Sequence, residues 1–138
     1  MVESKFSLLK SASIYSNFLN IFEDLKNHPK LAFNVETLLS TKNIDSILDS
    51  LIDDNLPFSE IVVGRTDLSR SLAIKDVNSE EIFRFIKSLI LKVKNQNINI
   101  NVGGNLTSKS FEFIKSLLEF GLSSFESRKC SFRCFGDI

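Results

Sequence analysis

Two acidic residues, Glu36 and Asp67, follow apolar segments that have the pattern of β-strands. Residues 31–36 alternate between apolar and polar side chains, and residues 60–63 include a β-branched run that ends at Gly64. The carboxyl ends of neighbouring parallel strands lie about 4.8 Å apart, so two such carboxylates can share one hard divalent cation. We therefore expect Glu36 and Asp67 to bind Mg²⁺ or Mn²⁺, with coordination positions left for water and substrate oxygens. The alternative is that both acids are helix caps or solvated loop residues.

The remaining reactive side chains form no catalytic or metal-binding pattern. Cys130 and Cys134 lack the further Cys or His ligands of a zinc site, because His28 is the only histidine in the chain. His28 precedes Pro29 at the end of a predicted helix, where a histidine caps the helix dipole. We expect neither a zinc site nor a histidine-based catalytic dyad, and the two thiols are expected to stay reduced.

Length and composition indicate a single domain spanning residues 1–138. Hydrophobic residues make up 43% of the chain, which is enough for a substantial core. Seventeen basic residues balance seventeen acidic ones, so no long-range field favours nucleic acid or an anionic membrane. No apolar run approaches the roughly 20 residues of a membrane span, and the first residues do not resemble a signal peptide. We expect a cytoplasmic protein that binds neither nucleic acid nor membranes.

Strand and helix patterns alternate along the chain. Arg65 to Asp67 is expected to be a loop at a strand end. Asn78 and Glu81 have the spacing of a capping box, and Thr107 is expected to cap the last helix. Apolar positions Phe111, Ile114, Leu117 and Leu118 of that helix are expected to face inward, and Gly121 to end it. The predicted helices are 4–29, 43–55, 78–93 and 107–121, and the predicted strands are 31–36, 60–63, 98–102 and 122–126.

The order of these elements predicts an α/β fold with parallel strands and right-handed crossovers, because the units recur every roughly 25 to 35 residues. Sites in such sheets lie at the carboxyl ends of the strands, where Gly64, Gly103 and Gly104 are found. If Glu3 ends a further strand, the chain contains about half of a (β/α)8 barrel, which typically has around 250 residues. We therefore expect a partial barrel that is truncated at both ends.

Five segments resemble, in order and over nearly the whole chain, the HpcH/HpaI aldolase/citrate lyase family of the phosphoenolpyruvate/pyruvate barrel superfamily, in its C-terminal half. The most specific is the run of residues 61–72, which contains Gly64-Arg65-Thr66-Asp67-Leu68-Ser69-Arg70-Ser71-Leu72. The others are Met1-Val2-Glu3-Ser4, Asn34-Val35-Glu36-Thr37, Val102-Gly103-Gly104-Asn105 and Phe125-Glu126-Ser127-Arg128-Lys129.

The resemblance implies a carbon–carbon lyase or aldolase that acts on a 2-oxo acid or related acyl substrate. In the family, a glutamate and an aspartate that match Glu36 and Asp67 hold a divalent cation, which stabilises an enolate. The backbone amides of Gly64, Arg65 and Thr66 would bind the substrate carboxylate, to which the Arg65 guanidinium could add a charge-assisted bond. A solvated loop arginine is the alternative for Arg65.

The resemblance also implies that part of the active site is missing, because the family's strands before Glu3 carry an arginine that neutralises the enolate. The chain would then be an inactive fragment or need a complementing N-terminal half, and unpaired sheet edges favour a homo-oligomer. A small doubly wound domain of receiver or flavodoxin type is a further alternative. No catalytic residue is assigned, and the substrate, any use of coenzyme A thioesters, and the roles of Glu3, Asn105, Glu126 and Arg128 stay open. An ion pair between Glu126 and Arg128 is the expectation for those two.

Overall fold

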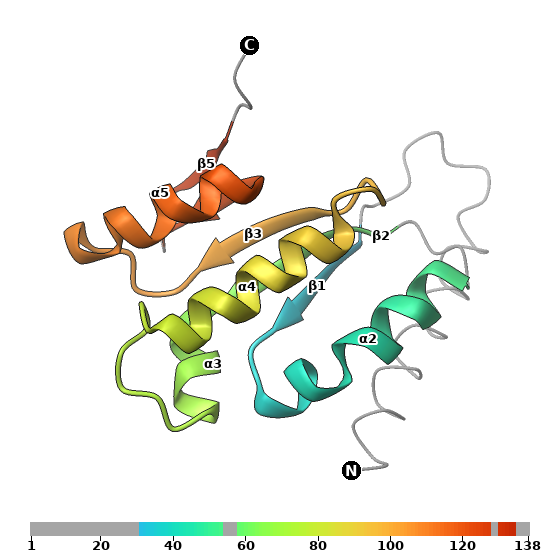
Figure 1. The fold of residues 1–138 in the computed structure, drawn as a ribbon, viewed down its shortest axis with the longest axis horizontal. Coiled ribbons are helices and arrows are strands. Elements are labelled where there is room, and N and C mark those ends of the chain that lie inside the picture. The colour runs from blue at the N-terminus through green and yellow to red at the C-terminus, as the bar shows by residue number, and fades with distance from the viewer. Residues whose placement is uncertain (1–30, 54–57, 128–129, 135–138) are drawn as a thin grey trace.

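The computed structural model describes residues 31–53, 58–127 and 130–134, which form a five-stranded sheet with helices packed against it (Figure 1). The predicted helix 4–29, with His28, and the predicted strand end at Glu3 lie outside the described residues. No helix in the described ranges is long and apolar enough to cross a membrane. The strands are β1 (Leu31–Val35), β2 (Phe58–Gly64), β3 (Asn99–Gly103), β4 (Ser124–Glu126) and β5 (Ser131–Arg133). The helices are α2 (Leu38–Asp53), α3 (Arg65–Ser71), α4 (Glu80–Val93), the 3₁₀ helix η1 (Ser108–Ser110) and α5 (Phe111–Phe120).

The strands lie in the sheet in the order in which they occur along the chain, β1-β2-β3-β4-β5. The first four are parallel, as expected from the strand–helix repeat. The prediction of an entirely parallel sheet is wrong for β5, which runs antiparallel to β4. A short connection between β4 and β5 explains the difference, because a parallel partner needs a crossover of a dozen or more residues.

The strand order also bears on the doubly wound alternative. In a flavodoxin-type or receiver-type sheet the order is 2-1-3-4-5, so that the second and third strands are not neighbours. Here β1 pairs directly with β2, and β2 with β3. The described part of the sheet therefore has no switch point and is wound in one direction.

One face of the sheet forms the core with α2, α4 and α5. In Figure 1, α4 runs alongside β1 and β3, with α2 and α5 on either side of it. The strand residues on this face are buried and aliphatic, and each packs into the same cluster as the inward residues of the helices. They are Val35, Ile61, Val63, Ile100 and Val102. Because side chains alternate along a strand, the residues between them point to the opposite face.

The opposite face is mostly polar, and we call it the polar face. Its central row runs through Asn34, Val62, Asn101 and Ser124, which are register partners on four adjacent strands. Asn34 is exposed, whereas Asn101 and Ser124 are buried. The polar face is therefore the side of the sheet on which side chains suited to ligand binding gather.

Two predicted helices begin at residues other than those expected, and a third, short helix was not predicted. The second predicted helix was expected from residue 43, but α2 begins at Leu38, because Thr37 and Ser40 cap it reciprocally through their hydroxyl groups and backbone N–H groups. Residues 65–67 were expected to be a loop and instead open the short helix α3. Ser79, not Asn78, is the N-cap of α4, since its hydroxyl oxygen accepts from the N–H of Ile82.

The prediction for α5 is partly confirmed. Thr107 forms a capping box with Ser110 around η1, which leads into α5, and Gly121 ends α5 in the left-handed conformation with φ 104°. The expectation that Phe111 and Leu118 face inward is wrong, because their exposed fractions are 65% and 38%. The helix buries Phe113 instead, together with Ile114 and Leu117.

We predict that Phe113→Ala lowers the free energy of unfolding by about 3 kcal/mol, since it empties a buried site beside the edge-packed ring of Phe83. Phe111→Ala on the same helix is the matched control, and it should change the stability by less than about 0.5 kcal/mol because its ring is in solvent. Urea unfolding followed by circular dichroism measures both. Equal losses for the two variants would contradict the observed orientation of α5.

Candidate functional site

A row of four residues crosses the carboxyl end of the polar face. Gly64 on β2 and Gly103 on β3 are register partners. Glu36 follows the β1 residue that pairs with Val63, and Glu126 follows the β4 residue that pairs with Val102. The row therefore reads Glu36, Gly64, Gly103, Glu126 across four parallel strands, with the two glycines in the middle.

The Glu36 side chain leans from β1 over β2. A Cβ atom on Gly64 would lie 2.8 Å from Glu36 Cγ and 2.9 Å from Glu36 Oε1, which is closer than Cβ atoms pack. The absence of a side chain at residue 64 is therefore what lets the carboxyl group lie there. The α2 cap at Thr37 immediately follows Glu36, and the amide of Asn34 contacts Glu36 Oε1 at 3.5 Å.

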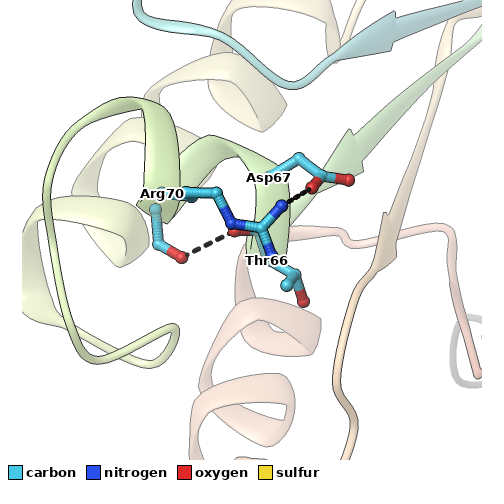
Figure 2. A network of polar contacts seen from close by, with 4 residues as sticks. Thr66, Asp67 and Arg70 are labelled. Carbon is cyan, nitrogen blue, oxygen red and sulfur yellow. Dashed lines mark hydrogen bonds and ion pairs between the residues drawn. The ribbon is translucent and has the colours of Figure 1, made fainter.

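Asp67 lies in the first turn of α3, which continues directly from the end of β2. Its Oδ1 pairs with Arg70 Nη1 at 3.0 Å, and Figure 2 shows the two side chains directed toward each other. The side chains of Asp67 and Arg70 are 57% and 77% exposed. An ion pair this exposed contributes at most about 1 kcal/mol, so the Asp67 carboxylate is free to turn toward a ligand at little cost.

Arg65 is fully buried, with an exposed fraction of 0%. Its Nε donates to the Gly103 carbonyl oxygen at 3.1 Å, and its Nη2 donates to that of Gly104 at 2.6 Å. Its Nη1 donates to Asn78 Oδ1 at 2.6 Å, and the guanidinium lies 5.0 Å from the ring centre of Phe113. Arg65 thus ties the end of β2 to the end of β3 and to the start of α4.

The sequence analysis left two roles open for Arg65, a bond to the substrate carboxylate or a solvated loop residue, and the structure tests only the second. The solvated loop alternative is wrong, because no part of the residue reaches solvent. Its proposed bond to a substrate carboxylate stays a prediction, although three of its nitrogens already donate to protein oxygens. Burial lowers the pKa of Arg65 to about 10, with Asp76 acting in the opposite direction, so the guanidinium stays charged at neutral pH.

Gly104 packs on the backbone at the start of α3. A Cβ there would lie 2.7 Å from the Thr66 backbone nitrogen and 3.1 Å from that of Arg65, and the positive φ of 85° also favours glycine. A side chain at residue 104 would therefore clash with the start of α3, so this close packing requires glycine.

Glu126 mirrors Glu36 on the other side of the row. Its Oε1 lies 3.2 Å from the position of a Cβ on Gly103, and its Oε2 accepts from Asn101 Nδ2 at 3.0 Å. The Oδ1 atom of Asn101 is buried and has no hydrogen-bond partner in the described structure. The predicted ion pair with Arg128 lies outside the described residues, whereas the contact with Asn101 gave no signal in the sequence.

The sequence predicts that the two cysteines are reduced thiols and not zinc ligands. Cys130 and Cys134 are free thiols, and burial raises the pKa of Cys134. Within residues 31–53, 58–127 and 130–134, no three acidic, histidine or cysteine side chains are grouped for metal binding. A cation at the carboxyl end of the polar face would thus take its other ligands from amide oxygens, water or substrate, which suits Mg²⁺ or Mn²⁺.

Comparisons with known proteins do not assign the chain to a family. No family model matches the chain, and no curated protein is significantly similar to it. The resemblance to aldolases and citrate lyases therefore rests on the short segments quoted above.

We predict that Arg65→Ala lowers the free energy of unfolding by about 3 kcal/mol or more. The substitution leaves the oxygens of Gly103, Gly104 and Asn78 without their charged donor, and each loss costs about 1–3 kcal/mol in a buried site. Chemical denaturation provides the measurement. Arg70→Ala, on the same helix, is the control and should stay within about 0.5 kcal/mol of the wild-type chain, because its ion pair is exposed. A mild effect of Arg65→Ala would show that the buried hydrogen bonds do not hold this end of the sheet.

Proposed function

We propose that the chain is the metal-binding part of a carbon–carbon lyase or aldolase that acts on a 2-oxo acid or a related acyl substrate. The observation that carries the proposal is the position of the Glu36 carboxyl group, which lies over Gly64 at the carboxyl end of β2. Asp67 follows Gly64 by three residues, in the first turn of α3. Glu36 and Asp67 are the proposed ligands of Mg²⁺ or Mn²⁺.

The geometry supports this pair in two ways. Both residues follow the carboxyl ends of adjacent parallel strands, which is where sites form in α/β sheets. Among the described residues, the ion pair that engages Asp67 is the exposed one with Arg70, so its carboxylate needs a side-chain rotation to become a ligand. Carboxylates are the ligands that hard divalent cations prefer.

The chain's own groups have separate roles in this proposal. The bound cation would supply Lewis-acid stabilisation of negative charge that develops on the substrate keto oxygen. The backbone N–H groups of Gly64, Arg65 and Thr66 would bind the substrate carboxylate. The buried Arg65 side chain would hold this backbone in place and add positive charge beneath it.

A partial (β/α)8 barrel is the proposed architecture. The four parallel strands follow one another without a switch point, and a polar face lies opposite the helices, where a barrel has its interior. The antiparallel β5 departs from this pattern at the last strand.

We predict that Mn²⁺ binds the wild-type chain and that Glu36→Gln and Asp67→Asn each weaken binding at least tenfold, because each removes one of few charged ligands. Electron paramagnetic resonance of free Mn²⁺ measures the affinity. Asp49→Asn, on α2 and exposed, is the control that keeps the wild-type affinity. Wild-type affinity in both ligand variants would remove the basis of the lyase proposal.

A second prediction concerns the glycine beneath Glu36. The backbone of Gly64, with φ −82°, is accessible to alanine, so Gly64→Ala should fold, but its Cβ displaces the Glu36 side chain. We expect melting within a few degrees of wild type and Mn²⁺ affinity reduced at least tenfold. A folded Gly64→Ala chain with unchanged affinity would show that Glu36 does not bind the cation from this position.

A further inference from the structure

The carboxyl end of the polar face carries a second acidic residue, Glu126, that the proposed function does not use. Neither Glu36 nor Glu126 is in a salt bridge within the described part of the chain. Each carboxyl group is instead contacted by the amide group of an asparagine. Asn34 on β1 contacts Glu36, and Asn101 on β3 contacts Glu126. Two carboxylates with only amide contacts form a concentration of negative charge that a cation would neutralise.

Each of the two carboxyl groups lies over a glycine of the neighbouring inner strand. Glu36 Oε1 lies within 2.9 Å of the Cβ position of Gly64, and Glu126 Oε1 lies within 3.2 Å of that of Gly103. Because Gly64 and Gly103 are register partners, these two positions are separated by about one strand spacing, roughly 4.8 Å. The two carboxyl groups therefore lie over adjacent positions at the same end of the sheet.

An independent observation points to a ligand at the same place. Asn101 is 4% exposed, and its Oδ1 is buried without a hydrogen-bond partner in the described structure. The other atom of the same amide, Nδ2, donates to Glu126 Oε2, so the amide head lies against the Glu126 carboxyl group. A buried carbonyl oxygen without a partner costs about 1–3 kcal/mol, and a cation or one of its bound waters can supply the missing interaction.

We propose that Glu126 is a ligand of a divalent cation that sits over the Gly64–Gly103 pair, opposite Glu36, and that Asn101 positions Glu126 and accepts from the hydration shell of the ion. The proposal rests on the proposed function only for the kind of cation. It adds a carboxylate on the β4 side of the site.

The test is a series of Mn²⁺ titrations, followed by electron paramagnetic resonance, on full chains whose folding is verified by circular dichroism. Glu126→Gln keeps the size of the side chain and removes its charge, and it should weaken Mn²⁺ binding at least tenfold. Glu60→Gln is the matched control, because Glu60 is half-buried on the polar face of β2 at the opposite end of the strand. It should keep wild-type affinity. Asn101→Ala should weaken binding severalfold even where its stability is restored by lower temperature.

The outcomes separate this inference from the proposed function. Loss of binding in Glu36→Gln and Asp67→Asn, with less than a threefold change in Glu126→Gln, would overturn the role of Glu126 and leave the lyase proposal standing. Loss in Glu36→Gln and Glu126→Gln, with Asp67→Asn unchanged, would support the inference and remove Asp67 from the site. Equal weakening by Glu60→Gln and Glu126→Gln would attribute the effect to general charge and overturn the inference.

Discussion

The buried guanidinium of Arg65 is the interaction on which the carboxyl end of the sheet depends. A single side chain from the start of α3 donates to two consecutive carbonyl groups at the end of β3 and to Asn78 before α4. Burying a charge is unfavourable unless it is well hydrogen-bonded, and here these hydrogen bonds and the face of Phe113 surround it. Because the charge must stay bonded, the ends of β2 and β3 are held in one arrangement.

That arrangement gives the glycines their role. With Gly64 and Gly103 aligned, the polar face has a floor of two residues without side chains, and glutamates on the flanking strands occupy the space above it. Gly104 allows the end of β3 to pack closely against the start of α3. Acidic side chains and a buried positive charge thus lie at the same end of the sheet, and the proposed lyase chemistry depends on this arrangement.

Sequence patterns predicted the parts of this structure that depend on local periodicity. The alternation in residues 31–36 and 98–102 gave β1 and β3, and Gly121 gave the end of α5. Boundaries failed where capping was overlooked, since Thr37 and Ser40 start α2 and Ser79 starts α4. The exposure of Phe111 could not be deduced from spacing alone, because either Phe111 or Phe113 completes an apolar stripe, and only the packing of Phe83 and Arg65 selects Phe113.

The site was predicted less completely than the fold. The strand-end rule located Glu36 and Asp67, but the contact between Asn101 and Glu126 joins residues 25 positions apart and depends on register. Likewise, the burial of Arg65 depends on Asn78 and on two backbone carbonyl groups nearly forty residues away along the chain. No sequence pattern predicts that these groups accept hydrogen bonds from Arg65.

The strictly sequential strand order has a consequence for how the chain acquires its structure. Every described strand pairs with the strand that precedes it along the polypeptide, so each new segment emerging from the ribosome meets an edge that has already been synthesised. Loops closed in this way are short in sequence, which keeps the entropy of closure low. The chain can therefore assemble vectorially, with each βα unit serving as the template for the next.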